Sequence, residues 1–122
     1  MNFVSIIMGS KCDHEVMNEC AKTLANFGVP YEMIVSSAHR SPQRTHDYVK
    51  NAETKGAKVF ICAAGMAAPT VAVGKAGAVN AAFMAMQILA LMDGVLASKL
   101  MEDRETKARN VEADSQTIEV RL

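Results

Sequence analysis

The residues of this sequence best suited to chemistry at neutral pH are His39 and Arg40, which lie between an apolar run and a Ser41-Pro42 pair. A histidine titrates near neutrality and can move a proton, whereas an arginine is a fixed cation that suits phosphate or carboxylate. A single His-Arg pair is more often two ordinary solvated loop residues. We give the pair more weight because a second polar loop, Gly9 to Asp13, lies one predicted strand and one predicted helix upstream.

The Gly9 to Asp13 loop and one more loop offer groups that could bind a ligand. The upstream loop reads Gly9-Ser10-Lys11-Cys12-Asp13, and it connects an apolar run to a helical pattern. The backbone N–H groups at such a helix start, next to the Ser10 hydroxyl, form a suitable site for phosphate. The other loop, Ala64-Gly65-Met66-Ala67-Ala68, has small side chains that let the backbone approach a ligand closely.

Alternating strands and helices must position these loops. The predicted strands are Phe3 to Met8, Tyr31 to Val35, Val59 to Ala63 and Thr70 to Val73, and predicted helices follow from Asp13, Ser41-Pro42 and Lys75. This order indicates a three-layer α/β fold, with a flavodoxin-like, mostly parallel sheet of about four strands, helices on both faces and long C-terminal helices. Ligands of such sheets bind beyond the carboxyl ends of the strands, so we expect one shared pocket.

Length and composition favour one small intracellular domain. The 122 residues contain 13 Lys and Arg against 13 Asp and Glu, so we expect a single domain over 1–122, with a core at 3–92 and a C-terminal helix and tail at 93–122. No basic run occurs beside aromatic residues, which argues against nucleic-acid binding. The three separated cysteines argue against a zinc site or a disulfide framework, and we expect a reduced, cytoplasmic protein without a signal peptide or a membrane span.

The segment Lys75 to Met92 is apolar on nearly all sides. One small domain cannot readily bury such a helix, so the pattern predicts a homo-oligomer. A further helical pattern follows Asp93-Gly94 and becomes strongly charged from Glu102 to Asp114. The last six residues, 117–122, alternate as a strand would, and a frayed tail is an equal alternative.

Four ordered motifs give the chain a close resemblance to a known family. They are Gly-Ser-x-x-Asp from Gly9, Ser-Ala-His-Arg-Ser-Pro from Ser37, Ala-Ala-Gly-Met-Ala-Ala from Ala63 and Gly-Lys-Ala-Gly-Ala-x-Asn-Ala-Ala from Gly74. Over residues 3 to about 100 the chain resembles 5-(carboxyamino)imidazole ribonucleotide mutase, the PurE family of purine biosynthesis. Because arginine follows His39, the chain resembles the bacterial mutase branch of the family rather than the branch that uses free carbon dioxide.

The resemblance implies an isomerase that moves a carboxylate from the exocyclic amine to carbon 4 of the imidazole ring, without metal or organic cofactor. It implies a small ribonucleotide as substrate and an octamer as the assembly. His39 would be the catalytic proton shuttle. The residues implied in substrate binding are Gly9, Ser10, Cys12, Asp13, Ser37, Ala38, Arg40, Ala64, Gly65 and Met66, with Arg40, Ser37 and the Ser10 loop on the phosphate and Asp13 on the ribose.

Two departures from the family pattern are visible. Cys12 replaces the usual serine, which exchanges a hydroxyl donor for a weak thiol donor. In addition, the family continues after the third loop with a histidine, a helix, a strand and a mobile loop, whereas here Ala68 is followed at once by Pro69. The resemblance therefore implies that an internal segment is missing, including the family's second active-site histidine.

The shortened connection constrains the predicted fourth strand. Only residues 64–69 join it to the third strand, while a parallel crossover needs about ten to twelve residues or more. Thr70 to Val73 would then turn back as an antiparallel strand or pair in a neighbouring subunit. We favour the second alternative, in which the strand takes the helix from Lys75 to Met92 with it.

Three functions remain open at this point. The first is the mutase. The second is a catalytically incomplete nucleotide-binding or assembly module that keeps the phosphate loops, and the third is a generic flavodoxin-like domain with chance motif matches.

Overall fold

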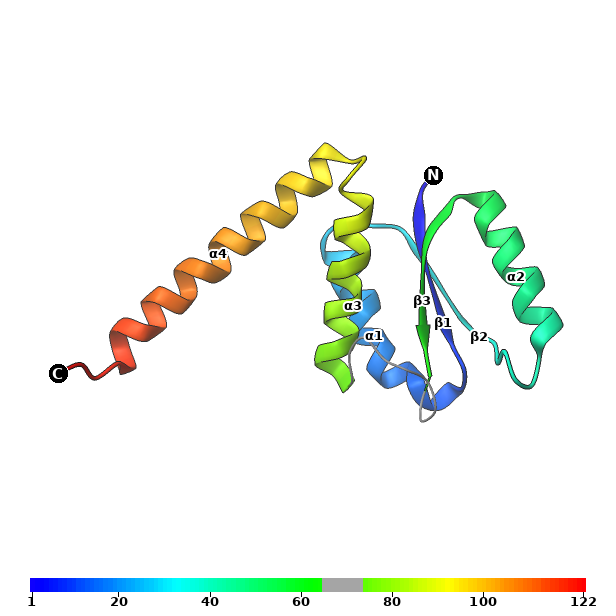
Figure 1. Ribbon diagram of the computed structural model, residues 1–122, viewed down its shortest axis with the longest axis horizontal. Helices are drawn as coiled ribbons and strands as arrows, with labels where there is room; N and C mark the ends of the chain where they lie inside the picture. The colour runs from blue at the N-terminus through cyan, green and yellow to red at the C-terminus, as the bar shows by residue number, and fades with distance from the viewer. Residues whose placement is uncertain (65–73) are drawn as a thin grey trace.

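A three-stranded parallel sheet with helices on both faces forms the body of the chain in the computed structural model, which describes residues 1–64 and 74–122 (Figure 1). The strand order is β2-β1-β3. The elements are β1 (Phe3–Met8), the short 3-10 turn η1 (Lys11–Asp13), α1 (His14–Asn26), β2 (Tyr31–Val35), α2 (Pro42–Lys55), β3 (Ala57–Ala63), α3 (Gly74–Leu89) and α4 (Gly94–Ile118). The expected α/β class and the three layers are confirmed.

The sheet differs in detail from the sequence expectation. The described part of the chain contains three strands, and the predicted strand at Thr70 to Val73 lies outside it. β3 begins at Ala57, two residues earlier than Val59, because Ala57 pairs with Phe3 at a register shift in the ladder. The described sheet therefore has three strands, and the fourth strand remains a prediction.

β1 is the central strand and all six of its residues are buried. Successive side chains of a strand point to opposite faces, so Ile6 belongs to the core beneath α1 and α3 while Phe3 packs with Ala52 of α2. Figure 1 shows α1 and α3 on one side of the sheet and α2 on the other. An almost uninterrupted apolar run is thus the correct signal for a strand covered on both faces.

Helix α3 packs on α1 and β3 of its own chain. Its small face, formed by Ala78, Ala82 and Ala85, is buried in the same core cluster as Leu24 of α1. Residues spaced by three and four lie on one helix face, and alanine side chains let two helices approach closely. The inference that this helix leaves its subunit is therefore wrong, because α1 supplies the surface that its small residues need.

Glycines end α1 and α2 where the sequence predicts it. Gly28 has φ 71° and Gly56 has φ 119°, a backbone region that other residues rarely adopt. A Cβ at Gly56 would also collide with the carbonyl of Met1. Ser41 occupies the predicted position before α2, but its side chain makes no capping hydrogen bond.

Helix α4 extends away from the sheet (Figure 1). Leu96 is its buried residue, and Lys107 places its ammonium 4.3 Å from the centre of the Phe83 ring. The tail after Ile118 forms no strand, which settles the two alternatives for the C-terminal residues in favour of an irregular tail. Among the described residues, no helix is both long enough and apolar enough to cross a membrane.

A polar network joins α2 to the sheet. The Tyr48 hydroxyl lies 2.7 Å from Oγ of the buried Ser5 and donates to Oε1 of Glu32 at 2.9 Å. Lys55 donates to the other Glu32 oxygen at 2.8 Å, and this hydrogen bond lowers the pKa of Glu32. Burial raises the pKa of Tyr48. The network fixes α2 over β1 and β2 at its C-terminal half.

Replacing Tyr48 by Phe should destabilise the chain by about 1–3 kcal/mol, because it removes the partner of the buried Ser5 hydroxyl. Urea unfolding measures the loss. Tyr31→Phe on the same sheet is the matched control, since the Tyr31 side chain is exposed. Equal losses in the two variants would contradict the role given to the network.

Candidate functional site

The carboxyl ends of the three described strands meet at one edge of the sheet. The backbone N–H of Gly9 donates to the carbonyl of Ala63 at 3.2 Å, and that of Ser36 donates to the carbonyl of Met8 at 2.9 Å. The loops that follow β1, β2 and β3 therefore start side by side, as the sequence predicts for a shared site.

The loop after β1 is a tight turn that leads into α1. The Ser10 hydroxyl oxygen accepts from the backbone N–H of Cys12 at 3.2 Å, and the N–H of Asp13 donates to the carbonyl of Ser10. Ser10 and Cys12 are exposed, and Asp13 is half-buried. Two N–H groups expected to be free for phosphate, those of Cys12 and Asp13, are thus already paired, while the Ser10 hydroxyl can still donate its proton.

The loop after β2 is also a closed turn. The Ser37 hydroxyl oxygen accepts from the N–H of Arg40 at 3.0 Å, and the N–H of Ser41 donates to the carbonyl of Ser37 at 2.7 Å. Ala38, His39 and Arg40 are all exposed at this edge. An imidazole and a guanidinium are therefore presented to solvent at the edge of the sheet from which the Ser10 loop also starts.

The loop after β3 is described only at its start. Ala64 is exposed, directly after the last residue of β3, and Gly65 and Met66 lie outside the described residues. Cys62 lies just before this loop; it is exposed as a residue, yet partial desolvation of its sulfur raises the pKa of the thiol. The predicted approach of the backbone to a substrate stays a prediction.

The sequence reasoning included Ser36 in the candidate loop but missed its half-buried partner Thr45, and it also missed Arg44. Ser36 is 4% exposed, and its hydroxyl lies 2.7 Å from Oγ1 of Thr45 on α2. Arg44 donates from Nη1 to the carbonyl of Val35 at 2.6 Å. The spacing of Ser41 and Thr45 by four residues was the available signal, since a threonine often bonds the carbonyl four residues before it.

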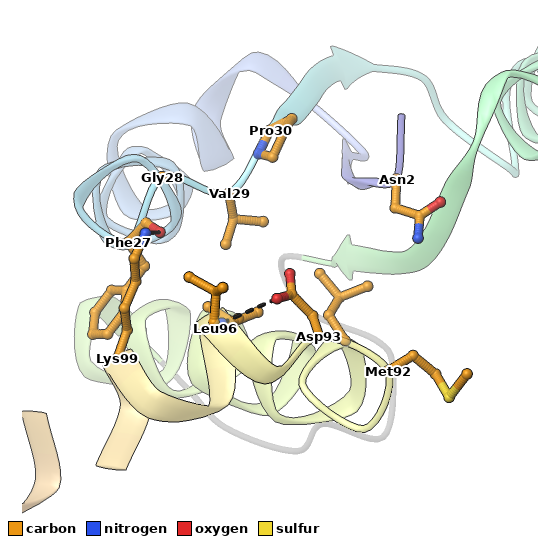
Figure 2. Close-up of a pocket in the computed structure, with 11 residues that line it drawn as sticks. Asn2, Phe27, Gly28, Val29, Pro30, Met92, Asp93, Leu96 and Lys99 are labelled. Carbon is orange, nitrogen blue, oxygen red and sulfur yellow. Dashed lines mark hydrogen bonds between the residues drawn. The ribbon is translucent and has the colours of Figure 1, made fainter. Parts of the chain in front are cut away.

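A hollow of about 120 Å³ lies at the opposite end of the sheet from the His39 edge (Figure 2). Asn2 and Pro30, which precede β1 and β2, contribute to its lining. Its two charged side chains are engaged, because Asp93 accepts from the N–H of Leu96 at 3.1 Å and Lys99 donates to the carbonyl of Phe27 at 3.1 Å. The edge with His39 is thus the better candidate.

In residues 1–64 and 74–122, no group of three or more His, Cys, Asp or Glu side chains is arranged to hold a metal ion. The donors of the candidate site are instead hydroxyls, a guanidinium and an imidazole. Such a set suits a phosphorylated organic ligand and a proton transfer.

Comparison with known proteins gives a family-model match over residues 3–69, to the model described as AIR carboxylase. The chain is also 36% identical over 146 aligned positions to the N5-carboxyaminoimidazole ribonucleotide mutase of Pyrococcus abyssi, with 87% of this chain and 84% of the relative covered. A shorter stretch of 65 residues is 54% identical to the Pyrococcus horikoshii mutase and covers 53% of this chain but only 37% of that relative.

The alignment with the Pyrococcus abyssi mutase is longer than the whole 122-residue chain, so that relative has residues inside the aligned region that this chain lacks. The family-model match ends at residue 69, where the sequence indicated a missing segment. A crystal structure of Treponema denticola PurE superposes with a TM-score of 0.81 at 20% identity, covering 98% of this chain and 100% of that one. The fold is therefore shared with that protein.

Proposed function

The chain belongs to the AIR carboxylase family, and from this premise we propose that it converts 5-carboxyaminoimidazole ribonucleotide to 4-carboxyaminoimidazole ribonucleotide, an isomerisation of purine biosynthesis. The observation that supports this proposal best is that the loops carrying Ser10 and His39-Arg40 leave neighbouring strands at the same edge of the sheet. We place the reaction in the cytoplasm, with the small ribonucleotide as substrate and without metal or cofactor.

In the proposed reaction the carboxylate leaves a nitrogen and joins a carbon, and one proton moves the other way. The bond between the exocyclic nitrogen and the carboxylate breaks and releases carbon dioxide, which then forms a bond to carbon 4 of the ring. The exocyclic nitrogen gains a proton as its bond to the carboxylate breaks, and His39 removes a proton from carbon 4 after the new bond forms, so that one proton moves overall from carbon 4 to the nitrogen. A closed pocket would keep the carbon dioxide near the ring until it is recaptured.

The remaining site residues bind the substrate in this proposal. Arg40 and Ser37 contact the ribose phosphate together with Gly9, Ser10 and Cys12, and Asp13 holds the ribose hydroxyls. Exposure of Arg40 and of the Ser10 hydroxyl at the same edge supports this arrangement. The backbone of Ala38, Ala64, Gly65 and Met66 would lie along the base and the migrating carboxylate.

A second candidate is a nucleotide-binding module of the same fold without turnover. The observation in its favour is that the Pyrococcus abyssi relative has residues inside the aligned region that this chain lacks. The third alternative, in which the motifs match by chance in a generic flavodoxin-like domain, is wrong, because the family model matches residues 3–69. An ultraviolet assay for the rearranged product, run beside a binding titration with aminoimidazole ribonucleotide, separates enzyme from module. Binding without product would favour the module.

We also infer a homo-oligomer, and the family resemblance suggests an octamer. Met84, Ile88 and Leu91 are exposed by 52%, 47% and 80%, and their spacing places them together on the outer side of α3 and its end. Exposed apolar patches of this kind are usually covered by another subunit.

Light scattering at micromolar concentration should report an assembly larger than a monomer, and Ile88→Glu should shift it towards the monomer by placing charge in the contact. Val111→Glu on α4 is the control, since Val111 is 67% exposed and distant in sequence from the α3 face. A monomeric unmodified chain would contradict the inference.

A further inference from the structure

Ser36 is a buried residue that joins two elements of the candidate site. Its backbone N–H donates to the carbonyl of Met8 at the end of β1, and its hydroxyl lies 2.7 Å from Oγ1 of Thr45 in the first turns of α2. Only 4% of Ser36 is exposed. Because buried hydroxyls are seldom left without partners, the Ser36–Thr45 pair fixes how α2 begins relative to β1.

The direction of the hydrogen bonds follows from proton count. Thr45 donates its single hydroxyl proton to the carbonyl of Ser41 at 3.0 Å, so the Ser36 hydroxyl must be the donor in the Ser36–Thr45 pair. Ser36 precedes the His39 turn, and Ser41 follows it. One threonine oxygen thus closes both ends of the turn that contains His39 and Arg40.

We propose that the Ser36–Thr45 hydroxyl pair positions His39 and Arg40 for the reaction, and this inference rests on the proposed function. Both side chains are exposed on a short turn, so its closure limits the conformations that they can sample. Small displacements of a catalytic group lower the chemical step strongly. Ser36 and Thr45 are positioning residues, since they act on the substrate only through the turn.

Thr45→Val removes the hydroxyl while it keeps the branched shape, and kcat should fall at least about tenfold. Thr45→Ser restores the hydroxyl and should return kcat to within about threefold of the unmodified chain. Thr54→Val is the matched control on the same helix, because Thr54 makes the same bond to the carbonyl of Lys50 at 3.0 Å but is exposed. We expect it to leave kcat unchanged.

The double variant Ser36→Ala with Thr45→Val separates positioning from stability. It removes both hydroxyls, so no unpaired group remains buried and the Tm should recover relative to Thr45→Val. The proposal predicts that kcat stays low while the Tm recovers. Recovery of kcat together with the Tm would overturn it, because the pair would then only stabilise the fold.

Amide hydrogen exchange tests whether the Ser36–Thr45 pair closes the His39 turn, and it does so without an activity assay. The N–H groups of Arg40 and Ser41 are bonded within the turn, and they should exchange at least about tenfold faster in Thr45→Val but not in Thr54→Val. Unchanged exchange would overturn the proposal whatever the activity. If the exchange responds as expected but the unmodified chain forms no product, the proposed function fails and the closure of the turn stands.

Discussion

His39→Asn should abolish product formation while binding of the ribonucleotide stays within about tenfold of the unmodified chain. The reason is that asparagine keeps a polar side chain of similar reach but cannot accept and return a proton near neutrality. His39 is exposed at the edge where the loops after β1 and β2 start side by side. A residue that serves mainly in proton transfer affects the chemical step more than the affinity.

The measurement combines the ultraviolet product assay with a binding titration on the same preparation. His46→Asn is the matched control, because His46 is also exposed on α2 but its contact is with the neighbouring Asp47. Unchanged turnover in His39→Asn would remove His39 from the mechanism. An equal loss in His46→Asn would show that the effect is not specific to the turn.

Arg40→Lys should weaken binding of the phosphorylated ligand by about tenfold or more, since lysine offers a point charge in place of two parallel hydrogen bonds. The loss should be much smaller for the dephosphorylated nucleoside. Titration of both ligands therefore isolates the contact with phosphate from any general effect on the fold.

Arg109→Lys on α4 is the control for the arginine substitution. Arg109 donates to Thr106 of its own helix, so the change should leave both affinities as they are. If Arg40→Lys loses no more affinity for the ribonucleotide than for the nucleoside, Arg40 does not contact phosphate.

The strands and helices near the site were predictable because their signals are local. β1 is an apolar run interrupted only by Ser5, and its residues are all buried, while α2 lies between Pro42 at its start and Gly56 at its end. Both signals depend on neighbours within a few residues. The meeting of the loops at one edge then follows from parallel strands.

The packing of α3 and the closure of the His39 turn were not predictable in this way. α3 contacts α1 although some fifty residues separate them, and a helix that is apolar on all sides does not reveal which partner covers which face. The Ser36–Thr45 pair likewise joins a strand end to a different element. Side-chain hydrogen bonds between elements depend on tertiary geometry, which composition and spacing do not encode.

Whether this shortened chain transfers the carboxylate itself is the central question about its function. In the decisive measurement, the protein is incubated with substrate that carries carbon-13 in the migrating carboxylate. The buffer contains unlabelled bicarbonate, and the product is analysed by mass spectrometry. We predict a product that retains the label, because carbon dioxide released in a closed pocket is recaptured before it exchanges with solvent. An unlabelled product, or no product from a chain that binds the ribonucleotide, would contradict the account.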